Sequence, residues 1–527
     1  MKPPSRPPSP PPYFRPTLDY PEYPFHGLLR SAFERFPEHL ALVDGEAELT
    51  FRELEGLSNA CARALLAAGI GPGDRVALFL PNSAEFEIAF FGASKAGAVA
   101  TPLNPSYKEE ETLHQLHDSG ARLLVANAEG AAIAKKIRGR LPDLFEIVAT
   151  EEGGGDLPRF AEWIRAHPPS PPPEPPINPS EDLIALPYSS GTTGLPKGVM
   201  LTHRNLVANY HQFVANHRIT ERDGGLIFLP LYHSYGTMLM GGLVLAGAKQ
   251  VLMRRFEVGE ALGLVERHRL TLFYGVPPAL LAITHHPGVE EHDLSSLRYI
   301  MSGAAPLPPE VRRRVEERTG VLTFMGYGLT ETSPVTHMNP ATAEGIVEES
   351  VGLPVSDLEQ KIVDAERGER ELPPGEAGEL ILRGPNIMKG YWNAPEATAQ
   401  ALRGGWLYTG DIARMDERGY VYILDRKKEM IKYKGFSVAP AELEALLHQH
   451  PRVADAAVIG KPDPEAGELP KAFVVPRGGG NLSPEELMAF VRERVAGYKQ
   501  IREVEFIEAI PKSRSGKILR RLLKERG

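Results

Sequence analysis

Apolar and polar positions follow two different periodicities along this chain. Thr50 and Glu53 have the spacing of a capping box, and the apolar positions after them recur at helical spacing as far as Gly69. The continuous apolar run at 75–80 (RVALFL) predicts a buried strand. The next elements are expected as a helix at 85–96 and strands at 98–102 and 123–126. Strands that alternate with helices predict a layered α/β architecture with parallel strands.

Proline-rich segments, and a change in the pattern of predicted helices and strands, divide the chain into units. Residues 168–179 (PPSPPPEPPINP) predict a stiff surface connection between two sub-lobes, and the short strands and Gly/Pro turns of 351–391 predict a small β module. The final unit is expected to hold a strand at 420–424, a helix at 440–448, a strand at 456–459 and a helix at 484–495. We therefore expect a disordered proline-rich tail (1–22), a large N-terminal domain (23–424) of two layered α/β sub-lobes plus a β-barrel-like module, and a small α+β C-terminal domain (425–527).

Composition narrows the class of protein. The 527 residues exceed one typical core, and a net charge of −9 gives no reason to expect nucleic acid as a partner. No stretch reaches the roughly 20 apolar residues of a membrane span, and the N-terminus lacks the apolar region of a secretory signal. The single cysteine, Cys61, is expected to be a buried small hydrophobe and fits a reducing compartment. We expect a cytoplasmic protein.

The segment Tyr188–Val199 (YSSGTTGLPKGV) carries the most informative pattern. It follows an apolar strand, its three glycines allow close backbone approach to a ligand, and successive N–H groups can form an anion-binding nest. Hydroxyl side chains and a lysine add donors and positive charge, which suits a triphosphate. No Gly-Lys-Ser/Thr sequence closes the segment, so it is not a Walker A loop. The candidate phosphate ligands are Ser189, Ser190, Gly191, Thr192, Thr193, Gly194 and Lys197.

This segment resembles the signature of the adenylate-forming superfamily, which includes acyl-CoA synthetases, 4-coumarate–CoA ligases, firefly luciferase and the adenylation domains of peptide synthetases. Six matches in the family's order, over most of the chain, are far more specific than any single one. They are LPLYHSYG at 229–236, SGAAPL at 302–307, GYGLTE at 326–331, YTGD at 408–411, DRKKEMIKYKGF at 425–436 and PKSRSGK at 511–517. Within the superfamily the chain looks most like a bacterial fatty-acyl-CoA synthetase.

The resemblance implies roles in nucleotide binding. Asp411 would hold the ribose hydroxyls, and Thr330 would contact the α-phosphate. Glu331, with help from the Ser189 hydroxyl, would bind Mg²⁺, a cation that takes oxygen ligands. The adenine slot would be lined by Gly303, Ala304, Gly326 and Tyr327.

The resemblance also implies that the small domain moves. Asp425 would be the hinge, Arg426 would contact the ribose, and Lys517 would enter the active site during adenylation. A preorganised cation there offsets the negative charge that builds as the carboxylate attacks the α-phosphorus. His233 matches a position at the acyl pocket. Further residues expected near the nucleotide or the pantetheine path are Lys428, Lys432, Lys434 and Gly435.

The implied reaction has two steps. A small carboxylic acid and MgATP give acyl-AMP and pyrophosphate, and the thiolate of coenzyme A then attacks the mixed anhydride and releases AMP. The protein supplies position and charge instead of a nucleophile. The alternatives are an aryl-acid–CoA ligase, a stand-alone amino-acid or acyl-AMP adenylating enzyme and, in a different class, a non-catalytic nucleotide-binding relative. A homodimer is left open.

The segments expected to wall the acyl pocket are largely apolar. They are residues 232–240, 273–277 and 302–305, and they contain no Arg or Lys for a second carboxylate and no Asp or Glu for an amine. The pattern predicts an apolar monocarboxylic acid, with medium- or long-chain fatty acids favoured over acetate. Each further buried methylene would then add up to about 0.8 kcal/mol of binding until the pocket is full.

Overall fold

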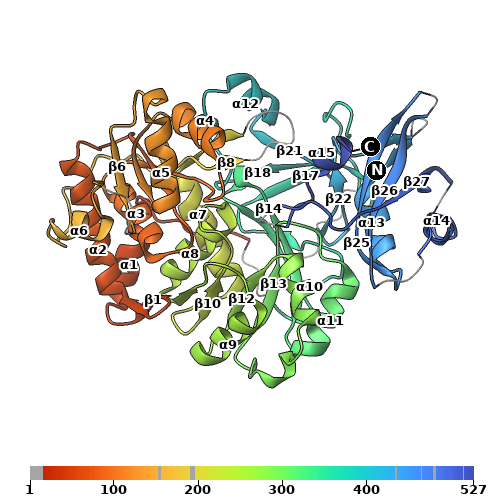
Figure 1. The fold of residues 1–527 in the computed structure, drawn as a ribbon, viewed down its shortest axis with the longest axis horizontal. Coiled ribbons are helices and arrows are strands. Elements are labelled where there is room, and N and C mark those ends of the chain that lie inside the picture. The colour runs from red at the N-terminus through yellow and green to blue at the C-terminus, as the bar shows by residue number, and fades with distance from the viewer. Residues whose placement is uncertain are drawn as a thin grey trace, which may run out of the picture.

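The computed structural model describes residues 16–151, 156–189, 196–433, 436–464, 466–478, 482–495, 497–513 and 516–526. Its helices and strands form a large N-terminal domain, at the left and centre of Figure 1, and a small C-terminal domain at the right. The mixed α/β class expected from the sequence is therefore confirmed.

The first sub-lobe contains an eight-stranded sheet in the order β19-β9-β7-β4-β3-β5-β6, with β8 beside β9. Strand β3 (Arg75–Phe79) lies parallel to both of its neighbours. Its residues Val76 and Leu78 join one hydrophobic core, and Ala77 and Phe79 join another. Both faces of the strand are buried, which explains the continuous apolar run. The other strands are β4 (Val99–Pro102), β5 (Ala121–Ala126), β6 (Glu146–Ala149), β7 (Leu183–Ala185), β8 (Tyr188–Ser189), β9 (Lys197–Thr202) and β19 (Gly390–Tyr391).

The second sub-lobe contains a nine-stranded sheet in the order β16-β15-β14-β13-β12-β10-β11-β1-β2. The strands from β14 to β1 in this order are parallel, so their carboxyl ends meet at one edge. In open parallel sheets this edge is where ligands bind. The strands are β1 (Leu40–Asp44), β2 (Ala47–Thr50), β10 (Gly224–Ile227), β11 (Lys249–Leu252), β12 (Leu272–Gly275), β13 (Tyr299–Ser302), β14 (Thr323–Gly328), β15 (Val335–Met338) and β16 (Leu353–Pro354).

Helices cover both sheets, and the predicted capping box is present. The Thr50 side chain accepts a hydrogen bond from the Glu53 N–H, and the Glu53 carboxylate accepts one from the Thr50 N–H. The free Cys61 is buried on the same helix, as expected. The helices of the large domain are α1 (Gly27–Arg35), α2 (Phe51–Ala67), α3 (Ala84–Lys95), α4 (Glu109–Ser119), α5 (Ala128–Ile137), α6 (Phe160–Arg165), α7 (His203–His217), α8 (Ser234–Ala246), α9 (Val258–His268), α10 (Pro277–His285), α11 (Pro309–Thr319) and α12 (Pro395–Ala401).

The most apolar helix of the chain is an interior one. All 13 residues of α8 are buried, because α1 and α7 pack against it. In the part of the chain that the structure describes, no helix combines the length and apolar character needed to cross a membrane.

A third sheet forms the β module, which is larger than the sequence predicted. Its order is β17-β18-β21-β20, with β22 paired to β21, so it extends well past residue 391. The strand expected at 420–424 belongs to this sheet rather than to the C-terminal unit. The pairing joins segments that are distant in the chain, and local patterns do not show it. The strands are β17 (Glu359–Val363), β18 (Gly378–Arg383), β20 (Leu402–Arg403), β21 (Trp406–Met415) and β22 (Val421–Arg426).

The small domain has its own sheet and its own core. The sheet order is β24-β23-β26-β25, with β27 parallel to β26. Leu443, Val458, Val474 and Leu487 are among the side chains of a separate buried cluster. The elements are β23 (Ile431–Tyr433), β24 (Phe436–Val438), α13 (Pro440–His448), β25 (Val453–Asp463), β26 (Gly467–Pro476), α14 (Pro484–Arg492), β27 (Glu503–Phe506) and α15 (Arg520–Lys524). The helix predicted at 440–448 is confirmed.

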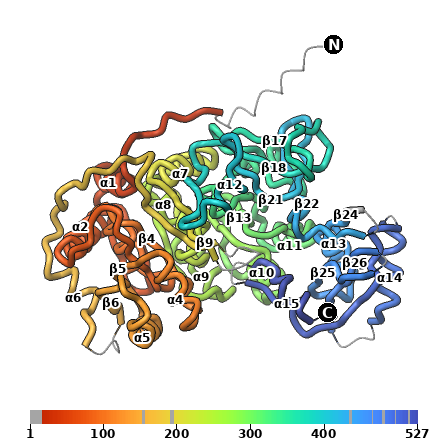
Figure 2. Tube along the Cα trace, turned by 90° about the horizontal axis from the view of Figure 1, so that it is seen from above, coloured from red at the N-terminus to blue at the C-terminus, as the bar shows by residue number. Residues whose placement is uncertain are grey.

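Residues 16–22, which the sequence analysis assigned to the tail, lie along the large domain. Figure 2 shows this red segment running from α1 towards β17 and β18. The Leu18 N–H donates to the Asp357 carboxylate at 2.9 Å, and the Asp357 N–H donates to the Pro16 carbonyl at 2.9 Å. The Tyr20 hydroxyl donates to the same carboxylate at 2.7 Å.

Candidate active site

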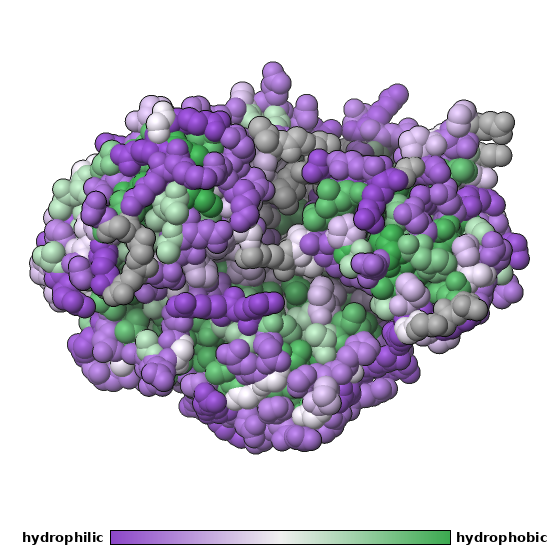
Figure 3. Space-filling view, in the orientation of Figure 1, coloured by the Kyte–Doolittle hydropathy of each residue, from purple (hydrophilic) through white to green (hydrophobic). Residues whose placement is uncertain are grey.

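A large cleft lies between the two domains, at the carboxyl ends of β12, β13 and β14. In the space-filling view the surface is hollowed between the large domain and the small domain at the right (Figure 3). The cleft has a volume of about 2980 Å³, well above the 300–1,000 Å³ typical of a site for one small molecule. The cleft therefore has room for a nucleotide together with a second substrate.

Asp411 anchors a buried polar cluster on the large-domain side of the cleft. Its carboxylate accepts a hydrogen bond from the Tyr327 hydroxyl and pairs with Nε of Arg426 at 2.7 Å. The register of β21 and β22 places Asp411 directly opposite Arg426, and Gly326 precedes Tyr327 on β14. Burial raises the pKa of Asp411, and Arg426 offsets part of that rise. A carboxylate beside an aromatic ring suits the ribose and base of a nucleotide.

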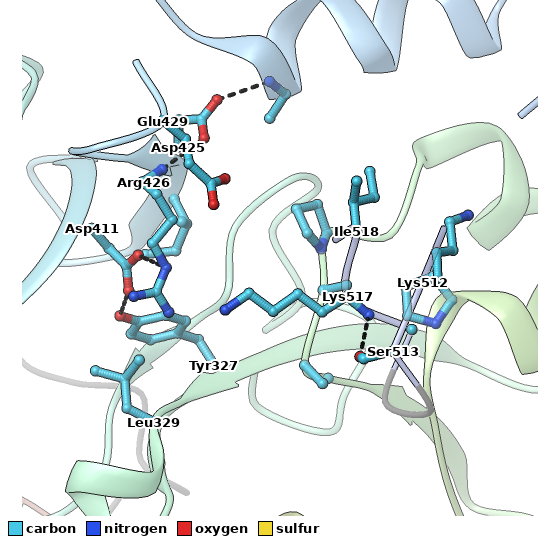
Figure 4. Close-up of a pocket in the computed structure, with 18 of the residues that line it drawn as sticks. Tyr327, Leu329, Asp411, Asp425, Arg426, Glu429, Lys512, Ser513, Lys517 and Ile518 are labelled. Carbon is cyan, nitrogen blue, oxygen red and sulfur yellow. Dashed lines mark hydrogen bonds and ion pairs between the residues drawn. The ribbon is translucent and has the colours of Figure 1, made fainter. Parts of the chain in front are cut away.

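Lys517 reaches this cluster from the small domain. Figure 4 shows its side chain extending from the C-terminal loop towards Tyr327 and Arg426. Burial and the neighbouring guanidinium of Arg426 lower the pKa of Lys517, and the carboxylates of Asp411 and Glu331 oppose that shift. The structure thus brings the predicted lysine and the predicted ribose carboxylate into one site, although they come from different domains.

Several contacts of the neighbouring described residues fix the position of Lys517. A β-bridge joins Lys512 to Ile518, and the lysine's own N–H donates to Oγ of Ser513 at 3.1 Å. Gly516 has φ +80°, and a Cβ at that position would lie 2.9 Å from Cδ of Pro278 in the large domain. Glycine therefore allows both the left-handed turn and the close contact between the domains.

Glu331 lies on the short helix η3 (Thr330–Thr332), directly after β14. Its Oε1 accepts a hydrogen bond from the Tyr391 hydroxyl at 2.9 Å, and Oγ1 of Thr330 lies 3.5 Å from Oγ of Ser234. A carboxylate among hydroxyl groups is the hard oxygen donor set that Mg²⁺ prefers, usually completed by substrate phosphates. No group of three His, Cys, Asp or Glu residues within the described ranges could hold a metal. The donors therefore fit a magnesium ion that arrives with a nucleotide.

The hairpin of β8 and β9 carries the described part of the signature segment. Ser189 pairs with Lys197 across the two strands, and both line the cleft. Nζ of Lys197 lies 5.6 Å from the ring centroid of Tyr391. The other predicted phosphate ligands, Ser190, Gly191, Thr192, Thr193 and Gly194, lie outside the described residues.

His233, Tyr235, Gly303 and Ala304 also line the cleft, as the sequence predicted. Nδ1 of His233 accepts a hydrogen bond from the Tyr235 N–H at 3.2 Å, which caps α8. Burial, followed by the charge of Lys517, lowers the pKa of His233 to about 4, so the imidazole is neutral at pH 7. A Cβ on Gly303 would lie 2.8 Å from Cε1 of Tyr235, so the absent side chain leaves room for that ring.

The remaining predicted cations differ in position. Lys428 lines the cleft, and burial lowers its pKa to about 8. Lys432 is exposed and lies outside the lining of the cleft, because it follows the buried Ile431 on β23 and faces the opposite side of the strand. Lys434 and Gly435 lie outside the described residues. Of the two described lysines, Lys428 lies at the cleft and Lys432 does not.

Asp425 connects the last strand of the β module to the small domain. Its carboxylate accepts hydrogen bonds from the N–H of Arg426 at 2.7 Å and from the N–H of Ala441, at the start of α13, at 2.9 Å. Burial raises the pKa of Asp425 to about 6, and the charge of Arg520 opposes the rise. Arg520 itself pairs with Glu444 at 2.7 Å.

Sequence reasoning missed Tyr391 and Arg520. Tyr391 stands in MKGYWN, where no charge or spacing suggests chemistry, and only its contact with Glu331 shows its relation to the site. Arg520 stands in the basic run KILRRLLKER, which looks like a solvated C-terminal tail. Its burial between two carboxylates becomes visible only once the small domain is folded.

Comparisons with known proteins match most of the chain. A family model described as AMP-binding enzyme matches residues 29–392, and a model of the AMP-binding enzyme C-terminal domain matches residues 442–517. A 4-coumarate–CoA ligase of Pinus taeda is 43% identical over 526 residues, which cover 95% of this chain and 95% of that protein.

Two solved structures are similar over nearly the whole chain. The anthranilate–CoA ligase AuaEII in complex with anthranoyl-AMP has a TM-score of 0.89 and 32% identity, and covers 97% of this chain and 98% of its own. ATP-bound MatB from Rhodopseudomonas palustris has a TM-score of 0.88 and 28% identity, and covers 95% of this chain and 98% of its own.

Proposed function

The chain belongs to the AMP-binding enzyme family, and on that premise we propose that it activates a hydroxylated aromatic acid of the 4-coumarate type. At the coarser level it is an ATP-dependent acid–thiol ligase that acts through an acyl-adenylate and coenzyme A. The relative from Pinus taeda is named a 4-coumarate–CoA ligase, which supports an aryl acid over the fatty acid expected from the sequence.

Each residue of the cleft would have a separate role in adenylation. Asp411 would accept the ribose hydroxyls, Tyr327 would face the base, and Glu331 with Ser189 would hold Mg²⁺ on the phosphates. Bound Mg²⁺ would supply charge neutralisation to the phosphate oxygens. Lys517 would place a positive charge where the carboxylate meets the α-phosphate, and positioning of this kind is how phosphoryl-transfer sites act.

A buried hydroxyl supports the choice of substrate. Tyr235 lines the cleft, and its buried hydroxyl has no hydrogen-bond partner among the described residues. An unsatisfied buried polar group costs about 1–3 kcal/mol. The ring hydroxyl of a phenolic acid could pair with it, whereas the end of an alkyl chain could not. The neighbouring Gly303 leaves space beside the Tyr235 ring.

We expect the catalytic efficiency, kcat/KM, to be about two- to tenfold higher for 4-coumarate than for cinnamate, because one neutral hydrogen bond contributes about 0.5–1.5 kcal/mol. Tyr235→Phe should remove this difference and leave the rate with cinnamate nearly unchanged. The measurement is carboxylate-dependent ATP–pyrophosphate exchange and thioester formation with 4-coumarate, cinnamate, octanoate, palmitate and acetate. A preference for octanoate or palmitate would contradict the aryl-acid proposal and leave the ligase mechanism in place.

A medium- or long-chain fatty acid is the second candidate. Leu281, Ala282, Met301 and Val335 give the cleft an apolar lining that suits an alkyl chain. For such a substrate, kcat/KM should rise with each methylene and then level off. We also propose a cytoplasmic location, with the single buried Cys61 as support, since it requires no oxidising compartment.

We further propose that the small domain turns about Asp425 between the two steps, which would bring Lys434 and Gly435 to the pantetheine path. Lys517 lies in the cleft, which supports assigning this arrangement of the two domains to adenylation. Asp425→Pro fixes φ at the hinge and should hold that arrangement. Acyl-adenylate formation should then stay within about tenfold of wild type, while thioester formation falls about 100-fold through misplacement.

The matched control for this prediction is Asp425→Ala, which removes the carboxylate contact with Ala441 but leaves the backbone free to turn. Rapid-quench measurement of each half-reaction separates the two effects. Wild-type thioester formation by Asp425→Pro would count against a hinge at this residue.

A further inference from the structure

The side chain of Tyr391 lies between two opposite charges that the cleft offers to a nucleotide. Its hydroxyl donates to Oε1 of Glu331 at 2.9 Å, and Nζ of Lys197 lies 5.6 Å from the centroid of its ring. Within the described ranges, neither charged group has another side-chain hydrogen bond or ion pair. One aromatic side chain therefore contacts both the carboxylate expected at the metal and the cation expected at the phosphates.

The backbone fixes Tyr391 relative to both partners. Strand β19 pairs with β9, which places Tyr391 opposite Val199, two residues from Lys197. The Met388 N–H donates to the Glu331 carbonyl at 2.9 Å, so the same segment also braces η3. Tyr391 is thus held on a short strand between the signature hairpin and the helix that bears Glu331.

This arrangement has an electrostatic consequence. An ammonium and a carboxylate that are free to meet form an ion pair, and that pair must be broken before either can bind a nucleotide. Tyr391 gives each group a separate partner: the hydroxyl for the carboxylate and the face of the ring for the ammonium.

We propose that Tyr391 is a positioning residue of the adenylation step, whose hydroxyl orients Glu331 towards Mg²⁺ and whose ring orients Lys197 towards the phosphates. This inference rests on the proposed function of the cleft. It concerns the adenylation step alone, because the β- and γ-phosphates that Lys197 would contact are released as pyrophosphate in that step.

Two substitutions separate the two contacts. Tyr391→Phe keeps the ring and removes the hydroxyl, and Tyr391→Leu removes both. Tyr420→Phe is the matched control, since it deletes a hydroxyl hydrogen bond of 2.8 Å to the Gly345 carbonyl away from the cleft. Three quantities are measured: the Mg²⁺ dependence of ATP–pyrophosphate exchange, Mn²⁺ binding by electron paramagnetic resonance with a non-hydrolysable ATP analogue, and thioester formation from supplied acyl-AMP.

We expect Tyr391→Phe to raise the Mg²⁺ concentration at half-maximal exchange about tenfold and to weaken Mn²⁺ binding by a similar factor, the size of one charge-assisted hydrogen bond. The KM for ATP at saturating metal should stay unchanged in Tyr391→Phe, which keeps the ring. In Tyr391→Leu it should rise about tenfold, because the contact of the ring with Lys197 is lost. Thioester formation should stay within about twofold of wild type in both variants.

Two results would overturn the inference. One is Mn²⁺ binding by Tyr391→Phe that equals that of wild type. The other is equal loss in both half-reactions with a lower unfolding temperature, which would make Tyr391 a structural residue. Failure of the proposed function looks different, since the wild-type enzyme would then show no exchange with any acid, while the Mn²⁺ comparison would still test Tyr391.

Discussion

Replacing Lys517 with alanine is expected to slow acyl-adenylate formation about 10²–10³-fold, the typical effect of removing one preorganised charge from a transition state. The lysine reaches the cluster of Tyr327 and Arg426 from the opposite domain, and its loop is closed by the bridge between Lys512 and Ile518. Thioester formation from supplied acyl-AMP should be nearly unchanged, because the domain turn proposed above would carry Lys517 out of the cleft before that step.

The test for Lys517 measures the two half-reactions separately. Lys461→Ala is the matched control, since it removes a small-domain lysine that pairs with Glu503 at 2.7 Å and lies outside the cleft. The control should leave both rates within about twofold, as expected for a surface ion pair. Equal loss of both half-reactions in Lys517→Ala would show that the lysine supports the fold of its domain instead of the chemistry.

Replacing Asp411 with asparagine should weaken ATP binding about 10–100-fold, because a hydrogen bond to a charged group contributes about 1.5–3 kcal/mol. The carboxylate is buried between Tyr327 and Arg426, so the substitution also leaves the guanidinium without its partner. Both half-reactions should suffer, in contrast to Lys517→Ala, since the acyl-adenylate still carries the ribose.

Titration calorimetry with ATP and thermal unfolding distinguish binding from folding here. Asp416→Asn is the control: Asp416 follows the same strand, pairs with Arg418 at 3.2 Å and lies outside the cleft. A lowered unfolding temperature for Asp411→Asn with unchanged ATP affinity would assign Asp411 to the fold alone.

Several elements could be read from the sequence because their causes are local. The capping box of Thr50 and Glu53 starts α2 where expected, and α13 spans the predicted residues. A cap joins residues three apart, and a buried parallel strand needs only a short apolar run. The predicted β module was too short because its extent depends on contacts that are not local. Strand β22 belongs to the module only through its pairing with β21.

The sequence by itself determined which chemical groups this protein has: a glycine-rich signature segment, a carboxylate shortly after Gly-Tyr-Gly, the aspartate of Thr-Gly-Asp and a lysine near the C-terminus. Only the tertiary structure decided which of them meet. The pair of Tyr327 and Asp411 spans 84 residues, and that of Tyr391 and Glu331 spans 60. Such contacts depend on strand register and domain packing, which the periodicity of a single segment does not encode. For the same reason the structure placed Lys432 outside the cleft and revealed Tyr391 within it.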